Sequence, residues 1–531
     1  MVIRLIIDFF LTIIFVNKKL KKNKLKQAES KLYEVKNSIS EFYLGELIKE
    51  KNNNKNYEET IFKLYCSNYQ FIYKKIINSK YFNHKIVNSI CNNTAFYFPL
   101  NEDTLNIIQS KKIKVNFLTS KILLNILKFS FILKNIFFVL FYLIVSFKFS
   151  FNNIHKKNII YLSYIPVIQH NRKSIKQDNF FLWVKKYFKI SSKVTFVHKN
   201  KIIRNQFLKE HNYEIKNHNF LINYFSIGRL PSIIKSILLA LKLFLKSKNK
   251  NKLSNLSCFI FEDLIIYFYL KINKNLRPKI CLFSNIELFY KPYWTYAIDE
   301  NTYLYYMSIN TNFINNRKLK TKFYDLFLTK FYTWKKYICW TKEQKNWILD
   351  NAYLSNPKVN LCNYIPYHGE NKLIKIPKKK IITIFDVPPK NEDLNKTFLN
   401  PYNIYSEKFC IKFLNDIINS IPKSDLKIII KIKYINKDIS SYYLRFLDKI
   451  EKKYKEKIII FRAGISAQSL IKISDIVISL PFSSPSIIAK RMKVRSYYYD
   501  PCNLVRLTKY NPKNVPLLSS KGKLKKVLNL I

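Results

Sequence analysis

The stretch SDIVISLPFSSPSIIAKRMKVRSYYYDP at residues 474–501 decides the fold. The apolar runs at 475–481 and 494–500 predict two buried strands. Between them lies the segment Pro481-Phe482-Ser483-Ser484-Pro485-Ser486. We expect a helix to begin at about residues 484–486, because proline suits the first turn of a helix and serine caps it. A strand, a helix and a second strand in this order predict a parallel sheet.

The same alternation extends upstream from this stretch. Further strands are predicted at 380–387, 426–434 and 457–464, and helices at 407–421, 439–454, 466–473 and 484–492. A Lys-rich segment with a proline at 371–380 predicts a linker before them. We therefore assign residues 376–531 to one Rossmann-like domain.

A second series of strands lies before the linker, and residues 156–375 are assigned to another Rossmann-like domain. Its strands are predicted at 158–165, 193–198, 279–285, 302–308 and 336–341. Residues 1–155 are predicted to be mainly helical, from apolar residues at helical spacing and Glu/Lys pairs. The expected fold is α/β, with two Rossmann-like domains facing a cleft. Ligands of such sheets bind beyond the carboxyl ends of the strands.

Composition limits the functional classes. The chain has 531 residues, and its 48% hydrophobic residues exclude a wholly disordered protein. Ninety-three Lys and Arg against 34 Asp and Glu give a net charge of +59. This charge suits nucleic acid or an anionic membrane, but Lys, Asn, Ile, Phe and Tyr dominate and have A/T-rich codons. We attribute most of the charge to a low-GC bacterial genome, and no nucleic-acid partner is expected because no zinc finger, basic zipper or RNP-type motif is present.

Cysteine and histidine usage predicts a reduced, cytoplasmic protein without a metal. The eight cysteines form no CxxC pair, and the seven histidines are scattered. No metal and no cofactor are expected.

Three segments indicate contact with the inner face of the plasma membrane. Residues 1–26 predict a short interfacial helix followed by a basic block. Residues 129–147 are long enough for a single transmembrane helix, but Lys134 and Asn135 interrupt them, so a buried, monotopic or interfacial helix is favoured over a span. Residues 231–248 place lysines among Ile and Leu, as a surface helix or a membrane-facing one does. The expected localisation is cytoplasmic and peripheral on an anionic membrane.

The segment 481–486 is a candidate phosphate site. The first N–H groups of the expected helix and the serine hydroxyls would bind an anion, although an ordinary N-cap has the same sequence. Other candidates follow strands, where a solvated charge or a turn cap is the alternative: Asp386, Lys431, Lys433, Arg462 and Asp500.

The sequence ISLPFSSPSIIAKRMKVRSYYYDP resembles the signature of bacterial polysaccharide biosynthesis proteins named for a Pro-Phe-Thr-Ser motif, with Ser483 in place of the threonine. FSNIELFYKPYWTYAIDE at 283–300 and ITIFDVPP at 382–389 are also similar to that family. The resemblance covers about residues 156–510 and implies a GT-B glycosyltransferase with two Rossmann-like domains. It further implies that the C-terminal domain binds a nucleotide sugar. With that assignment, the candidate donor-site residues at the strand ends and in the motif are Asp386, Lys431, Lys433, Arg462, Pro481, Phe482, Ser483, Ser484, Ser486 and Asp500.

A general base for the acceptor hydroxyl is expected from the other side of the cleft. Candidate catalytic residues are Glu287, Glu300 and His368, although a loop histidine without a role is the favoured interpretation of His368. Tyr290, Lys291 and Trp294 are candidates for acceptor binding, because aromatic rings pack on sugar faces. For the aromatic residues among them, a place in the core is the alternative.

The function expected from these observations is sugar transfer from a nucleotide sugar to a lipid-linked or glycan acceptor in capsule, O-antigen or similar surface polysaccharide biosynthesis. Lysines and a helix N-terminus would stabilise the leaving phosphate without a metal. The alternatives are a non-catalytic scaffold of a polysaccharide assembly complex and a basic nucleic-acid-binding protein.

Overall fold

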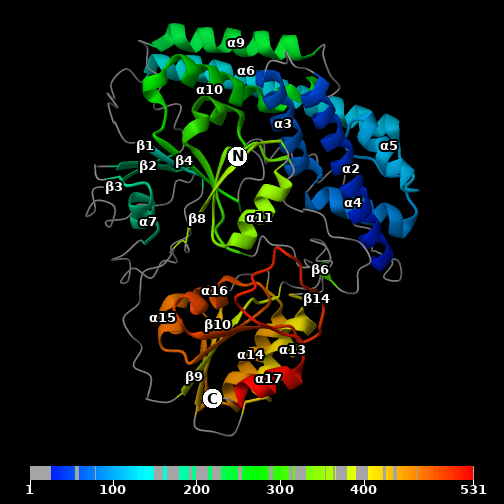
Figure 1. The fold of residues 1–531 in the computed structure, drawn as a ribbon. Helices are drawn as coiled ribbons and strands as arrows, with labels where there is room; N and C mark the ends of the chain where they lie inside the picture. The colour runs from blue at the N-terminus through cyan, green and yellow to red at the C-terminus, as the bar shows by residue number, and fades with distance from the viewer. Residues whose placement is uncertain are drawn as a thin grey trace.

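The computed structural model of the chain (Figure 1) describes residues 25–53, 59–77, 79–148, 159–163, 179–190, 194–198, 213–217, 229–248, 254–285, 291–309, 315–316, 331–352, 354–362, 365, 380–389, 405–421, 426–433, 439–462 and 465–529. The expected interfacial helix at 1–26 and the linker at 371–380 lie almost entirely outside them.

The second domain is built on a six-stranded parallel sheet with the order β11-β10-β9-β12-β13-β15. Its strands are β9 (Lys380–Asp386), β10 (Leu426–Ile432), β11 (Ile458–Phe461), β12 (Ile476–Ser479), β13 (Arg495–Tyr499) and β15 (Leu517–Leu518). Its helices are α13 (Glu407–Ile418), α14 (Ser441–Lys453), α15 (Ala467–Lys472), α16 (Ser484–Arg491) and α17 (Lys521–Leu528). Runs of Ile and Val form the central strands because a parallel sheet is buried on both faces.

The first domain has a seven-stranded parallel sheet with the order β3-β2-β1-β4-β5-β7-β8. Its strands are β1 (Ile159–Leu162), β2 (Val194–His198), β3 (Tyr213–Asn217), β4 (Ile280–Ser284), β5 (Thr302–Tyr305), β7 (Lys336–Cys339) and β8 (Lys358–Leu361). Its helical elements are α7 (Asn179–Tyr187), α10 (Phe261–Ile272), η6 (Lys274–Leu276), η7 (Tyr293–Asn301) and α11 (Lys342–Asn351). With two such sheets, the expected fold class of two Rossmann-like domains is confirmed.

The N-terminal region is helical, as expected, where the structure describes it. It comprises α2 (Leu25–Asn53), α3 (Glu59–Ile72), η2 (Tyr73–Ile77), α4 (Lys80–Asn92), α5 (Glu102–Ser110) and α6 (Phe117–Lys148). Two elements inserted in the first domain pack with it, α9 (Leu230–Lys248) and η5 (Ser254–Ile260). The buried side chains of these helices form one hydrophobic cluster with one face of the first sheet, from Ala28 to Val359. The helical region therefore shares its core with the first domain.

The two domains meet at the carboxyl ends of their strands. The N–H of Ile309, which follows β5, donates to Oγ of Ser484 at the start of α16. The guanidinium of Arg491, at the other end of α16, donates to the carbonyl of Trp340, which follows β7. In addition, β6 (Asn315–Asn316) pairs antiparallel with β14 (Val505–Arg506). Residues after the strands of both sheets are thus brought together.

Candidate functional site

The order of the second sheet has its topological switch point between β9 and β12. From β9 the chain adds β10 and β11 on one side, and later β12, β13 and β15 on the other. Parallel α/β sheets bind ligands in the crevice at the carboxyl ends next to such a point. The residues there are Asp386, the last residue of β9, and the turn 480–483 that follows β12. Two of the predicted segments therefore converge on the expected place in the sheet.

The turn 480–483 holds a conformation that a bulky residue adopts rarely. Phe482 is buried and has a φ of 60°. Its ring packs edge-on against the ring of Tyr498, with centroids 5.5 Å apart, and the Tyr498 hydroxyl donates to the carbonyl of Ser483 at 3.2 Å. Such backbone strain costs about 1–3 kcal/mol and persists only where packing enforces it. Pro481 is buried in the same turn, so neither Pro481 nor Phe482 offers a side chain to solvent.

Ser483 has a buried hydroxyl without a hydrogen-bond partner among the described residues. The residue is 4% exposed, and it is the N-cap of α16, yet its Oγ accepts no bond from the first turn. The capping serines of α13, α14 and α15 do accept such bonds. Helix starts leave N–H groups that attract anions. Ser483 and the first turn of α16, which begins at Ser484 as predicted, therefore retain hydrogen-bonding capacity for a ligand.

Asp386 is the second buried polar group at the switch point. It is 2% exposed; Oδ2 accepts a hydrogen bond from the Tyr443 hydroxyl, and Oδ1 has no partner among the described residues. Burial raises the pKa of Asp386 to about 7, although the neighbouring backbone N–H of Val387 acts to lower it. The carboxyl group therefore titrates near neutral pH, which is unusual for an aspartate.

Lys431 is the last residue but one of β10, next to β9, and Lys433 directly follows the strand. Lys431 is buried, its Nζ donates to the carbonyl of Ile432 at 2.9 Å, and burial lowers the pKa of Lys431. Because Ile432 is opposite Asp386 in the register, Lys431 lies on the other face of the sheet from Asp386. Lys433 is exposed just after the strand. Both lie at the carboxyl edge of the sheet, and burial of the amine lowers the pKa of Lys433 as it does that of Lys431.

Three predicted donor-site residues have a different environment from the one expected. The Ser486 hydroxyl is buried, lies 2.6 Å from that of Ser479 and bonds the Tyr497 carbonyl. The Asp500 carboxylate is buried and accepts bonds from the N–H groups of Cys502 and Val505. Both side chains hold the domain together, which corrects the phosphate or sugar contact expected of them.

Arg462 is the third of these residues. It follows β11, the edge strand, and its guanidinium bonds Asp448 at 2.7 Å and Glu451 at 2.6 Å. Strands β10 and β9 separate β11 from β12, a distance of about 14 Å at ordinary strand spacing. Arg462 is therefore paired with carboxylates of α14, at a distance from the turn 480–483.

In the first domain, Lys291 and Trp294 are core residues. Lys291 is fully buried, its Nζ forms an ion pair with Asp299 and lies 4.0 Å from the centroid of the Tyr296 ring. Burial lowers the pKa of Lys291 to about 8, although Asp299 opposes this shift. Trp294 packs on the ring of Tyr161. Neither side chain presents a surface to an acceptor. Trp294 is therefore a core residue, and the acceptor contact expected of Lys291 is replaced by its buried ion pair with Asp299.

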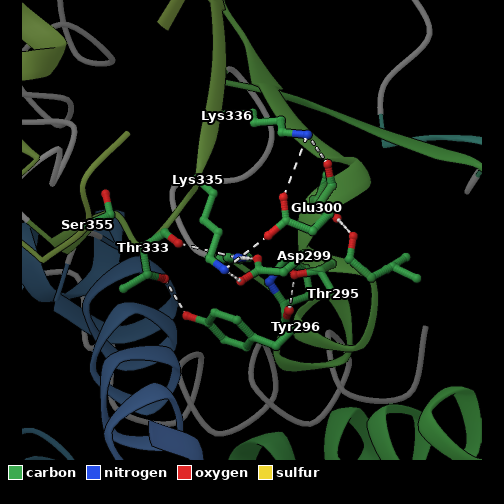
Figure 2. A network of polar contacts seen from close by, with 12 residues as sticks. Thr295, Tyr296, Asp299, Glu300, Thr333, Lys335, Lys336 and Ser355 are labelled. Carbon is green, nitrogen blue, oxygen red and sulfur yellow. Dashed lines mark hydrogen bonds and ion pairs between the residues drawn. The ribbon is translucent and has the colours of Figure 1, made fainter. Parts of the chain in front are cut away.

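Glu300 lies at the wrong end of the first sheet for the catalytic role expected of it. Figure 2 shows it in a polar network with Asp299, Lys335 and Lys336. It is 74% exposed and precedes β5, whereas Ile309, the contact with Ser484, follows β5. The 3-10 helix η7 carries the chain back to the amino edge of the sheet. Glu300 is therefore excluded as a base facing the turn 480–483.

The other candidates of the first domain lie outside the described residues: Glu287, Tyr290 and His368. Among the described residues, no group of three His, Cys, Asp or Glu could hold a metal.

The sequence reasoning missed the switch point of the first sheet, between β1 and β4, where the Ser163 hydroxyl accepts a bond from the Ser284 N–H at 2.9 Å. It also missed Tyr443, the partner of Asp386. Ser163 could have been found from its position near the end of the strand predicted at 158–165.

Solved structures with a similar arrangement have low identity. A glycosyltransferase from Rickettsia africae is 13% identical, with 71% of this chain and 88% of that chain covered and a TM-score of 0.35. The wall teichoic acid polymerase TagF with CDPG is 11% identical, with 76% and 88% covered and a TM-score of 0.36. A putative UDP-N-acetylglucosamine 2-epimerase from Listeria monocytogenes is 11% identical, with 70% and 88% covered and a TM-score of 0.35. At such scores, the fold class rests on the two sheets themselves.

The sequence itself gives a clearer relationship. No curated protein matches the chain. A family model does match, over residues 241–528, which is more than half of the sequence and includes the turn 480–483. The chain belongs to the family of polysaccharide biosynthesis PFTS motif proteins.

Proposed function

We propose that this protein is a glycosyltransferase of bacterial surface polysaccharide biosynthesis. It transfers a sugar from a nucleotide sugar to a lipid-linked or glycan acceptor, such as a capsule or O-antigen precursor, at the cytoplasmic side of the inner membrane. The observation that supports this best is the pair of buried polar atoms at the switch point, Ser483 Oγ and Asp386 Oδ1, that lack a partner among the described residues. An unmade hydrogen bond in the interior is costly, so a polar ligand is the natural partner for both.

In this proposal the donor's phosphates bind at the start of α16. The Ser483 hydroxyl and the first N–H groups of α16 would donate to phosphate oxygens, and Lys431 and Lys433 would add positive charge at the same edge of the sheet. These groups would stabilise the phosphate as it leaves, with no metal needed for that charge. Asp386 would bond a ribose or sugar hydroxyl through Oδ1.

The general base would come from the first domain, because its strand ends meet α16 through Ile309. Glu287 is the leading candidate, since it comes two residues after Asn285 at the carboxyl end of β4. His368 is the second candidate. We propose neither Glu300 nor Lys291 for the reaction.

The test is binding and turnover with a panel of nucleotide sugars. Calorimetry should find at least one nucleotide sugar that binds, and product analysis with a membrane extract as acceptor should find transfer of its sugar. Glu287→Gln should retain binding and lose transfer. Binding without transfer by the unaltered chain would favour a non-catalytic scaffold. No binding of any nucleotide sugar would remove the proposal.

A further inference from the structure

Helices α6 and α9 carry most of the large apolar side chains that the described residues expose. Of 22 such side chains, eleven lie on α6 and four on α9. The two helices contact one another and both pack on η5 and α10. In Figure 1 they lie along the side of the first domain that faces away from the second domain. Soluble monomers rarely expose a contiguous apolar area of this kind unless something binds it.

The exposed side of α9 has the pattern of an interfacial helix. Ile234, Leu238, Leu241 and Leu245 are exposed and recur at intervals of four, three and four residues, so they form one stripe. Lys235, Lys242 and Lys246 are also exposed. Each follows a stripe residue by one position, which places the three lysines along one flank of the stripe. An apolar stripe with a lysine flank suits the boundary between acyl chains and head groups.

Two polar residues in the middle of α6 face the protein. Lys134 forms an ion pair with Glu262 at 2.9 Å, and the Asn135 side-chain amide donates to the carbonyl of Cys258 at 2.8 Å. The exposed side from Ile126 to Ile144 is apolar, with Phe129 and Phe137 61% and 70% exposed.

By length and composition, residues 117–141 could cross a membrane. A spanning orientation would surround α6 with lipid, however, and would separate Lys134 and Asn135 from their partners. The packing instead favours a helix that lies in the plane of the membrane.

We propose that the exposed faces of α6 and α9 form one membrane-binding surface, and that its partner is the interface of a bilayer containing anionic lipid. Charge decides between this partner and a second copy of the chain. The two helices contain eight lysines and no acidic residue. A two-fold contact between copies would bring these lysines together, whereas anionic head groups attract them. The net charge of +59 acts in the same direction.

This surface is distinct from the candidate donor site, so it can be tested without any enzymatic readout. The full chain is mixed with vesicles of phosphatidylcholine alone, or with about one third phosphatidylglycerol, and bound protein is measured by flotation. We expect binding to the anionic vesicles and much weaker binding to phosphatidylcholine. Lys235→Glu with Lys242→Glu should weaken binding at least about 30-fold, since each lysine near an anionic surface contributes about 1 kcal/mol and each glutamate adds repulsion. Leu238→Glu with Leu245→Glu should weaken it by at least about tenfold.

Matched controls place the same changes elsewhere on the surface. Lys449→Glu with Lys452→Glu changes the charge equally on α14, and Leu182→Glu alters an exposed leucine of α7. Both should bind vesicles nearly as the unaltered chain does, and circular dichroism should show all variants folded.

Three outcomes would overturn the proposal. The first is no binding to anionic vesicles, or equal binding by the α9 leucine variant. The second is a stable dimer in light scattering that this variant dissociates. The third is resistance of the membrane-bound chain to carbonate extraction, which would indicate a spanning helix. None of these outcomes depends on nucleotide-sugar binding, so this inference and the transferase proposal can fail separately.

Discussion

The backbone N–H of Ile309 in the first domain donates a hydrogen bond of 3.4 Å to Oγ of Ser484 in the second. Ser484 is the first residue of α16, directly after the turn 480–483. A ligand bound at this turn would therefore lie beside both domains. This relationship links the proposed donor site to the domain from which the base should come.

Ser483→Ala should weaken nucleotide-sugar binding without lowering the stability of the fold. The Ser483 hydroxyl makes no bond among the described residues, so its removal should leave the free energy of unfolding unchanged or raise it by about 1 kcal/mol. Nucleotide-sugar affinity should fall about tenfold or more, because a hydrogen bond to a charged group is lost. Urea unfolding and calorimetry measure the two quantities.

The matched control for this prediction is Ser406→Ala. Ser406 caps α13 through its side chain, so the variant should lose about 1 kcal/mol of stability and keep its nucleotide-sugar affinity. If Ser483→Ala behaves like Ser406→Ala, Ser483 is an ordinary cap.

Asp386→Asn should change how stability depends on pH. The pKa of Asp386 is about 7 in the folded chain, against 3.8 as its ordinary value. Between these values the folded state holds a proton that the unfolded chain has released. The stabilising effect of this proton on the folded state is therefore fully present below about pH 4 and is lost as the pH rises to about 7. Relative to Asp386→Asn, the unaltered chain should lose roughly 2–3 kcal/mol of stability between about pH 5 and pH 7. Parallel pH profiles in urea unfolding would contradict a buried, protonated Asp386.

Phe482→Ile should be more destabilising than Phe482→Leu. The two replacements have equal volume, but β-branched residues tolerate a φ of 60° poorly. We expect a difference of about 1 kcal/mol or more in the free energy of unfolding. The same pair at Phe385, in the central strand β9, provides the control. At Phe385 the Ile variant should be as stable as the Leu variant or more stable, because strands favour β-branched residues. An identical order at both positions would argue against strain in the turn.

Lys291→Met should affect folding and not acceptor binding. The replacement leaves Asp299 without its buried partner, and removing one member of a buried pair costs about 3–5 kcal/mol. The double variant Lys291→Met with Asp299→Asn should recover part of this loss in thermal unfolding. In the folded fraction, the KM for acceptor should be unaltered. If Lys291→Met raised the KM for acceptor and left the stability unchanged, Lys291 would be an acceptor-binding residue after all.

The second domain was largely predictable because its strands are long apolar runs between amphipathic helices. The strands over 380–387 and 426–434 and the helix over 407–421 were located to within three residues at each end. Short edge strands gave no such signal. In β8, for example, buried Val359 stands between partly or fully exposed neighbours, and β15 has only two residues. Such strands form because a neighbouring strand provides hydrogen bonds, which the local sequence does not record.

The site was predictable as a place but not residue by residue. Strand ends identified Asp386 and the turn 480–483. The rotation of α16 decides which serine hydroxyl is already bonded within the domain. It separates Ser483, which caps the helix, from Ser486, which lies in its first turn. Glu300 was misplaced because η7 returns the chain to the amino edge of the sheet before β5 begins. The course of the chain between two strands cannot be predicted from hydrophobic periodicity.

The segment between β13 and β15 has a mechanical consequence. From the second domain it reaches back to the first: β14 pairs with β6, and Tyr510 and Lys509 bond Asp350 of α11 at 2.8 and 2.7 Å. It then returns to β15, so the chain passes between the domains three times, counting the connection before β9. Any hinge motion that admits substrate must flex all three crossings together. The segment between β13 and β15 thus acts as a tether that restrains how far the two domains can move apart.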